Sequence, residues 1–141
     1  MTKQTDGTEI RVLIADDQAL VRKGILALLS TEPEIAVVGE GENGREAATK
    51  AEELRPDVIL MDINLPDLNG IEATQRIHRD MPQIRIIALS MHDNPNYTEA
   101  MHAAGAVDYI TKDCHPSEII KSIRMSLAGT PPPSQTESIN R

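Results

Sequence analysis

Five side chains that can bind a cation or a phosphoryl group stand at or just beyond the ends of short apolar runs. They are Asp16 and Asp17 after residues 10–15, Asp62 after 58–61, Ser90 after 84–89 and Lys112 after 106–110. Short apolar runs with polar boundaries indicate buried strands. In doubly wound sheets, ligands bind at the carboxyl ends of the strands. We therefore expect these side chains to converge on one site.

The three carboxylates predict a magnesium site. Negative charges held in a small space repel one another, and a cation removes that repulsion. Carboxylate and carbonyl oxygens, together with water, suit Mg2+. Beside such a cation, Asp62 could attack a phosphorus atom as a carboxylate nucleophile and form an acyl phosphate. Lys112 and the Ser90 hydroxyl would then neutralise and hydrogen-bond the phosphoryl oxygens.

Each of these residues also has a purely structural interpretation. An aspartate after a strand commonly caps the next helix, and a serine in that position commonly lies in a turn. A lone lysine is commonly a solvated charge. Five such residues at successive strand ends would need five separate structural explanations, which is less plausible than one shared site. The hypothesis of a phosphoryl-transfer site therefore depends on the set.

The elements that must position these side chains follow from the apolar pattern. Strands are predicted over residues 10–15, 35–39, 58–61, 84–89 and 106–110. Helical spacing follows each strand, and Pro56, Gly105 and Pro116 suit the end of the second helix, the end of the fourth and the start of the last. Nearly continuous apolar strands are typical of a parallel sheet covered on both faces. We predict an α/β fold, a flavodoxin-like doubly wound sheet of five parallel strands in the order 2-1-3-4-5.

The composition favours a soluble cytoplasmic domain. The chain has 141 residues, 40% of them hydrophobic, and a formal net charge of -8. This acidic balance disfavours direct binding to DNA or to anionic membranes, which relies on clusters of Lys and Arg. One cysteine, Cys114, cannot form an internal disulfide. No apolar run reaches the roughly 18 residues that indicate a membrane span, and the N-terminus lacks the apolar region of a secretory signal.

Both ends of the chain differ from its middle. Residues 1–8 are polar and are expected to be a flexible N-terminus, followed by a single domain over residues 9–128. Residues 129–141 are polar and rich in proline, with Pro131, Pro132 and Pro133 in succession. Such a composition is typical of a disordered linker. We expect this linker to lead to a further domain.

Four segments together resemble the receiver domains of response regulators, particularly the NarL/FixJ-like (LuxR-type) subgroup. The resemblance covers about residues 10–128, and it is strongest in Leu13–Asp17, Met61–Gly70, Ala88–His92 and Tyr109–Asp113. It implies a fold of the CheY-like type. Pro66 and Gly70 match the shape of the loop that follows the phosphoacceptor in this family.

The resemblance implies a role for each residue of the site. Asp16 and Asp17 match the acidic pair that binds Mg2+, Asp62 matches the phosphoacceptor, and Asn64 matches the position whose backbone carbonyl completes the metal site. The remaining matches are Ser90 as the hydroxyl switch residue, Tyr109 as the aromatic switch residue and Lys112 as the phosphate-binding lysine. Asp113 is a departure, because many receivers have a proline there, after a cis peptide bond.

A two-state response to phosphorylation follows from the same resemblance. Ser90 would move toward the phosphoryl group, and Tyr109 would turn into the space that Ser90 leaves. We place Met101, Tyr109 and Ile119 on or beside the resulting output surface, although apolar stripes such as those of Met101 and Ile119 more often belong to the core. His92 either tunes the lifetime of the phosphoryl group or is a solvated loop histidine.

The partners implied by the resemblance are a sensor histidine kinase and a C-terminal helix-turn-helix domain in the full-length protein, with a phosphorylation-dependent dimer also considered. The function would then be transcription regulation. One alternative is a stand-alone receiver that signals by protein–protein contact, and another is an interaction module that is no longer phosphorylated. A third is a Mg2+-dependent aspartyl phosphohydrolase, but Asn64 replaces the second aspartate of haloacid-dehalogenase-type phosphatases. We expect no enzyme activity beyond self-phosphorylation and self-dephosphorylation.

Overall fold

The computed structural model describes residues 9–91 and 94–127, which form five parallel strands and five helices. The strands are β1 (Ile10–Ala15), β2 (Ile35–Gly41), β3 (Val58–Asp62), β4 (Arg85–Ser90) and β5 (Asp108–Thr111). The helices are α1 (Ala19–Leu29), α2 (Gly44–Leu54), α3 (Gly70–Asp80), α4 (Pro95–Ala104) and α5 (Pro116–Leu127). The sheet order is β2-β1-β3-β4-β5, which confirms the predicted α/β fold and its strand order.

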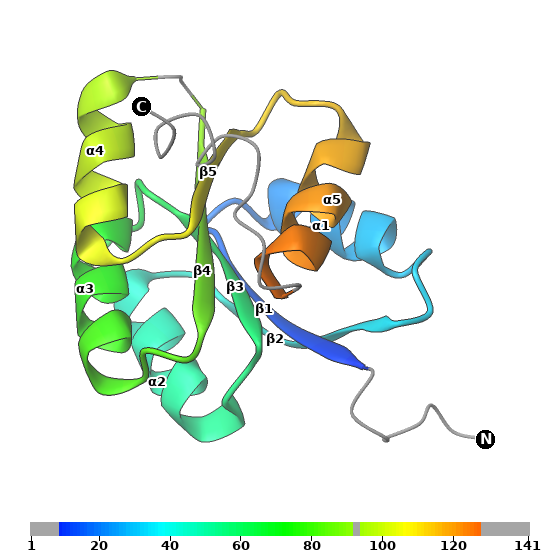
Figure 1. Cartoon of the computed structure of the whole chain (residues 1–141), viewed down its shortest axis with the longest axis horizontal. Helices are drawn as coiled ribbons and strands as arrows, with labels where there is room; N and C mark the ends of the chain where they lie inside the picture. Colours follow the sequence, from blue (N-terminus) through cyan, green and yellow to red (C-terminus); the bar gives the residue numbers. More distant parts are fainter. Residues whose placement is uncertain (1–8, 92–93, 128–141) are drawn as a thin grey trace.

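The helices cover both faces of the sheet. Helices α2, α3 and α4 lie on one face, and α1 and α5 lie on the other (Figure 1). Successive residues of a strand point to opposite faces. Leu13 therefore packs in the core cluster under α2, α3 and α4, whereas Ile14 packs in the cluster under α1 and α5. Both residues are fully buried, as a parallel sheet covered on its two faces requires.

Helix boundaries follow from local side-chain chemistry. Asn43 caps α2 by accepting a hydrogen bond from the Glu46 backbone N–H, and Asn69 caps α3 in the same way from Glu72. At the end of α4, Gly105 adopts φ +122°, a conformation that favours glycine, and its N–H bonds back to the helix. The predicted cap at Gly105 is thus confirmed.

Two predicted strand boundaries were wrong by two residues. The fifth strand begins at Asp108 and not at Ala106, because the Ala106 N–H bonds to the carbonyl of Met101, 2.9 Å away, and still closes α4. The second strand continues to Gly41 and not to Gly39. Val12 pairs with Val37 and Leu13 with Gly39, so β2 has one extra residue, Val38, and the pairing continues as far as Ala15 with Gly41.

Two interpretations of Met101 and Ile119 were open, a place on or beside an output surface and a place in the core, and the structure supports the core. Met101 is fully buried in the cluster under α2, α3 and α4, and Ile119 is 7% exposed in the cluster under α1 and α5. Both residues belong to the core. Tyr109 is half-buried at the edge of the first cluster.

Three predictions concern parts of the chain outside the described residues. These are the flexible N-terminus over 1–8, the linker over 129–141 and the role of His92. Across residues 9–91 and 94–127, no helix has the length and apolar character that a membrane crossing needs.

Candidate functional site

The residues predicted to form the site lie along one edge of the sheet, the edge formed by the carboxyl ends of its strands. Asp62 is the last residue of β3 and Ser90 is the last residue of β4. Asp16 follows β1 directly, and Lys112 follows β5 directly. Because the strands are parallel, all of these positions are carboxyl ends. The sheet thus brings together residues that are up to 96 positions apart in the sequence, from Asp16 to Lys112.

Backbone hydrogen bonds hold the chain in place just beyond the strand ends. The Asp16 N–H donates to the carbonyl of Gly41, 3.0 Å away, and the Lys112 N–H donates to that of Ser90, 2.7 Å away. The Ile63 N–H donates to the carbonyl of Leu89 at 3.0 Å. The backbone therefore remains ordered by the sheet where the functional side chains begin.

Three carboxylates meet at this edge. Asp16, Asp17 and Asp62 each offer an oxygen within 4.8 Å of the others. Asp16 and Asp62 are buried and Asp17 is exposed, so the cluster opens to solvent on the Asp17 side. The geometry brings together the three acids that the sequence predicted.

Lys112 supplies the positive charge of the cluster. Its ammonium nitrogen lies 2.7 Å from Oδ2 of Asp16 and 3.2 Å from Oδ2 of Asp62. The side-chain oxygen of Gln18 lies 3.4 Å from the same nitrogen. The Lys112 side chain is only 9% exposed, so these contacts are weakly screened by solvent.

The surroundings of Asp62 raise the pKa of its carboxyl above the ordinary value. Burial is the largest cause, and the neighbouring carboxylate of Asp16 adds to it. Lys112 and the backbone N–H of Asn64 act in the opposite direction and lower the pKa. That N–H lies 3.2 Å from Oδ1 of Asp62. Asp62 is thus a buried carboxylate whose charge is only partly compensated by the protein.

The donor set fits a hard divalent cation. Oδ2 of Asp16 is buried, forms an ion pair with the Lys112 ammonium and accepts no hydrogen bond from any other described residue. Aspartate oxygens are the ligands that Mg2+ prefers, and an open side leaves room for the waters that Mg2+ retains. An acidic cluster able to hold a cation is therefore present.

The loop after β3 is shaped by two close backbone approaches. A Cβ on Gly70 would lie 2.1 Å from the carbonyl oxygen of Asp62, and a Cβ on Gly44 would lie 1.5 Å from that of Leu68. Only glycine fits either position without displacing backbone. Asp67, at φ 71°, is held at the loop surface by an ion pair with Arg45. The glycine predicted to shape this loop thus contacts the backbone of Asp62 itself.

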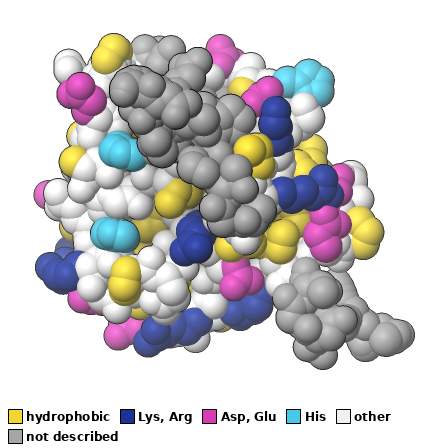
Figure 2. Space-filling model, in the orientation of Figure 1, with side chains coloured by type: hydrophobic (Ala, Val, Ile, Leu, Met, Phe, Trp, Pro, Cys, Tyr) yellow, Lys and Arg dark blue, Asp and Glu magenta, His cyan; other side chains and the backbone are white. Residues whose placement is uncertain are grey.

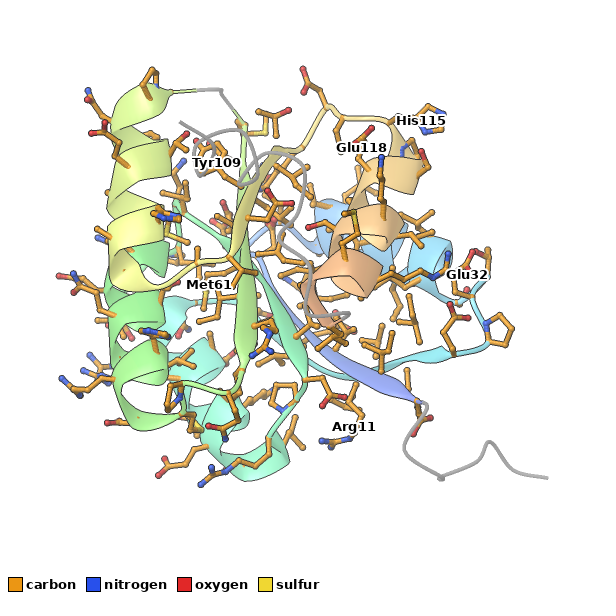
Figure 3. The ribbon with its side chains drawn as sticks, viewed as in Figure 1. Arg11, Glu32, Met61, Tyr109, His115 and Glu118 are labelled. Carbon is orange, nitrogen blue, oxygen red and sulfur yellow. The ribbon has the colours of Figure 1, made fainter. Side chains whose placement is uncertain are left out.

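The two predicted switch residues lie on neighbouring strands. Ser90 is fully buried, and Tyr109 is half-buried on β5, with Ala88 of β4 as its register partner. Figure 3 shows Tyr109 on β5, at the side of the strand that faces α4. The described residues contain no cis peptide bond, so the peptide between Lys112 and Asp113 is trans.

Sequence reasoning missed Gln18 and Arg22. Gln18 contacts Lys112 at 3.4 Å, and the Arg22 guanidinium donates to the main-chain oxygen of Asp16 at 2.6 Å. No signal for Arg22 was present in the sequence, because a charged residue near the start of a helix is normally solvated. Apolar periodicity does not detect such a contact.

A family model described as the response regulator receiver domain matches residues 12–124. The chain therefore belongs to the receiver-domain family of two-component response regulators.

Relatives and solved structures refine this assignment to the LuxR/NarL group. The chain is 36% identical over 129 residues to the transcriptional regulatory protein DegU of Brevibacillus brevis, covering 92% of this chain and 55% of DegU. A two-component response regulator of the LuxR family from Aurantimonas sp. SI85-9A1 superposes with a TM-score of 0.84 at 34% identity, covering 94% of this chain and 96% of that one. For the receiver domain of the putative response regulator NarL from Mycobacterium tuberculosis, the TM-score is 0.82 at 29% identity, with coverages of 86% and 98%. The chain spans about half the length of the curated relatives it matches, 55% in the case of DegU.

Proposed function

We propose that Asp62 accepts a phosphoryl group from a sensor histidine kinase. The observation that carries this proposal is the contact of one ammonium, that of Lys112, with two buried carboxylates at adjacent strand ends, 2.7 Å from Asp16 and 3.2 Å from Asp62. Such an arrangement is costly for stability alone, because buried charges lose their hydration. It suits a site in which carboxylates, a cation and an anionic group must share a small space.

The cation ligands are part of this proposal. The carboxylates of Asp16, Asp17 and Asp62 and the backbone carbonyl of Asn64 would hold Mg2+. When bound, Mg2+ would offset the repulsion between these carboxylates and an incoming phosphoryl group. Because Asp17 is exposed, the cation and the phosphoryl group can both enter the site from the Asp17 side.

Transfer of the phosphoryl group then requires little covalent chemistry from the protein. An oxygen of Asp62 forms the new bond to phosphorus, and the bond between phosphorus and the donor's histidine nitrogen breaks, with the electron pair returning to that imidazole. Lys112 is close enough to Asp62 to pair with the phosphoryl oxygens once they are bound. The Ser90 hydroxyl would hydrogen-bond the same group.

Output is proposed to follow a population shift involving Ser90 and Tyr109. The Lys112 N–H bonds to the Ser90 carbonyl, and Tyr109, on β5, lies three residues before Lys112. A short stretch of backbone therefore connects the acidic site to Tyr109 on the outermost strand. Movement of Ser90 toward the phosphoryl group would let Tyr109 turn inward. The surface of α4, β5 and α5 would change shape as a result.

The kinase is proposed to dock over the first turn of α1. Leu20 is 82% exposed there, four residues after Asp16, and Met91 is 52% exposed just beyond β4. A groove of about 790 Å³ lies between α1 and α5, and Gln18, Met91 and Lys112 line it together with apolar residues. A donor histidine must come within bonding distance of Asp62, so its carrier must cover this edge. Exposed apolar side chains beside the site suit such a contact.

The signal is proposed to reach an attached helix-turn-helix domain and so to regulate transcription. The proposal is supported by the name of DegU, a transcriptional regulatory protein of which this chain spans 55%. The chain itself is not proposed to bind DNA. On the face seen in Figure 2, Lys and Arg side chains are interspersed with Asp and Glu and form no single basic patch among the described residues. A phosphorylation-dependent dimer, or a stand-alone receiver acting by protein contact, would use the same site.

Treatment with acetyl phosphate and Mg2+ tests the proposal. The protein should gain one phosphoryl group by intact mass, and Asp62→Asn should gain none. Asp67→Asn is the matched control, because Asp67 is an exposed aspartate of the same loop, paired with Arg45. Equal labelling of both variants would overturn the assignment of Asp62. Multiple turnover of an external phosphate ester would instead indicate a phosphohydrolase.

A further inference from the structure

Arg22 folds back over the start of its own helix toward the acidic site. Its backbone N–H bonds to the carbonyl of Gln18 in the first turn of α1. Its guanidinium passes that turn, and Nη1 donates to the main-chain oxygen of Asp16, 2.6 Å away. The Arg22 side chain is only 12% exposed, so the contact is largely shielded from water.

This contact completes the fixation of Asp16. The Asp16 N–H donates to the carbonyl of Gly41, and its Oδ1 accepts from the Gln18 N–H at 2.8 Å. Its Oδ2 lies 2.7 Å from the Lys112 ammonium. Arg22 is thus the group that holds the remaining polar atom, the carbonyl oxygen. With Arg22 in place, Asp16 is 0% exposed, so its carbonyl oxygen depends on the guanidinium and not on water for a partner.

The charge of Arg22 is paired with two glutamates outside the cluster of three aspartates. Nε of Arg22 lies 3.0 Å from Glu40, and Nη2 lies 3.6 Å from Glu42, both at the end of β2 or just beyond it. These two glutamates offset the guanidinium charge. Its effect on the acidic site is therefore one of placement: the planar group spans from β2 to the backbone that carries Asp16.

We propose that Arg22 is a positioning residue for the cation site, holding the backbone of Asp16 so that its carboxylate faces Asp17 and Asp62. This inference rests on the proposed function, since it concerns how Mg2+ is bound. Without Arg22, the Asp16 carbonyl would be a buried acceptor with no partner, and the turn would shift to reach water. Residues that orient metal ligands affect metal affinity by about 10- to 100-fold.

The affinity for Mg2+ is the direct measurement. The amide signals of the 15N-labelled protein are followed while Mg2+ is added, and the labelling rate with acetyl phosphate is measured at saturating Mg2+. Arg22→Met should raise the dissociation constant for Mg2+ by about tenfold. At saturating Mg2+, the variant should recover much of the labelling rate of the unmodified protein. Arg124→Met is the matched control, because it also removes a cation paired with two glutamates, Glu32 and Glu34, on another part of the surface.

Arg22→Lys separates placement from charge and remains available if Arg22→Met does not fold. Lysine retains the charge but cannot reach Asp16 and Glu40 with one planar group, so we expect an intermediate affinity. Wild-type affinity in Arg22→Lys, or equal losses in Arg22→Met and Arg124→Met, would overturn the role of Arg22. Failure of the proposed function is distinguishable, because the unmodified protein would then show no Mg2+-dependent shifts and no phosphoryl group on Asp62.

Discussion

The ammonium nitrogen of Lys112 forms an ion pair with Oδ2 of Asp16, 2.7 Å away, and this buried oxygen accepts no hydrogen bond from any other residue in 9–91 and 94–127. Asp16 and Lys112 lie near opposite ends of the domain's sequence. They meet because the carboxyl ends of β1 and β5 lie on the same side of the sheet. Lys112 therefore provides the compensating charge for carboxylates that are also suited to hold a divalent cation. A bound cation would offset the charge of the same carboxylates.

Replacement of Lys112 by Met should destabilise the protein most when Mg2+ is absent. Removing one partner of a buried ion pair leaves the other charge uncompensated, at a cost of about 3 kcal/mol. The free energy of unfolding in urea, with and without Mg2+, measures this, and Mg2+ should restore more stability to the variant than it adds to the unmodified protein. Lys23→Met, at an exposed position of α1, is the control. Unchanged stability of Lys112→Met without Mg2+ would contradict the account.

The raised pKa of Asp62 predicts a pH-dependent effect of Asp62→Asn on stability. Burial and Asp16 raise this pKa, so the folded state binds the Asp62 proton more tightly than the unfolded chain does. Ionised Asp62 therefore opposes folding at neutral pH. Without Mg2+, Asp62→Asn should increase the free energy of unfolding at neutral pH, and the gain should shrink as the pH falls through the folded-state pKa. Denaturation across acidic and neutral pH measures it, and a gain that grew with acidity would show the sign to be wrong.

Two glycine-to-alanine substitutions should have opposite effects. Gly70→Ala places a Cβ 2.1 Å from the Asp62 carbonyl oxygen, which requires a backbone shift, and should cost roughly 1–3 kcal/mol. Gly24→Ala meets nothing within 4 Å in the middle of α1 and should gain about 1 kcal/mol from helix propensity. Thermal or urea unfolding measures both changes, and Gly70→Ala should also slow labelling of Asp62. A neutral Gly70→Ala would mean that the loop does not need this close approach.

Leu20→Ala should impair phosphotransfer from a kinase but not from acetyl phosphate. An exposed leucine in a docking surface contributes about 1.5 kcal/mol when buried, equivalent to roughly a tenfold change in the rate of transfer at low protein concentration. Transfer is followed from an autophosphorylated histidine kinase that labels the unmodified protein. Leu127→Ala, at an exposed leucine of α5, is the matched control. If Leu20→Ala and the unmodified protein accept phosphoryl groups equally from the kinase, the docking site lies elsewhere.

The sequence predicted the positions of the acidic residues because strand ends are visible in it. The apolar runs before Asp16, Asp62 and Ser90 stop abruptly, and parallel order then places their ends together. Boundaries that depend on caps and register were less accessible. The start of β5 was misplaced because Ala106 is apolar and yet bonds to α4, and the end of β2 was misplaced because a register shift lengthened the pairing.

Side-chain direction could not be predicted from spacing alone. Helical periodicity places Met101 and Ile119 on apolar stripes, and it favoured the core over an output surface without deciding between them; the structure places both residues in the core. Arg22 illustrates the opposite limit. A charged residue in the first turn of a helix normally indicates solvent contact, and only the structure shows its guanidinium turned back to the Asp16 carbonyl.

Chemical localisation of the phosphoryl group is the most direct test of Asp62 as the phosphoacceptor. An acyl phosphate on an aspartate is reduced by borohydride to homoserine, whereas a free carboxylate is not. The protein is treated with acetyl phosphate and Mg2+, reduced, digested and sequenced by mass spectrometry. We expect homoserine at position 62 and unmodified aspartate at positions 16, 17 and 67. Homoserine at one of those other positions, or at none, would contradict the assignment of Asp62 as the phosphoacceptor.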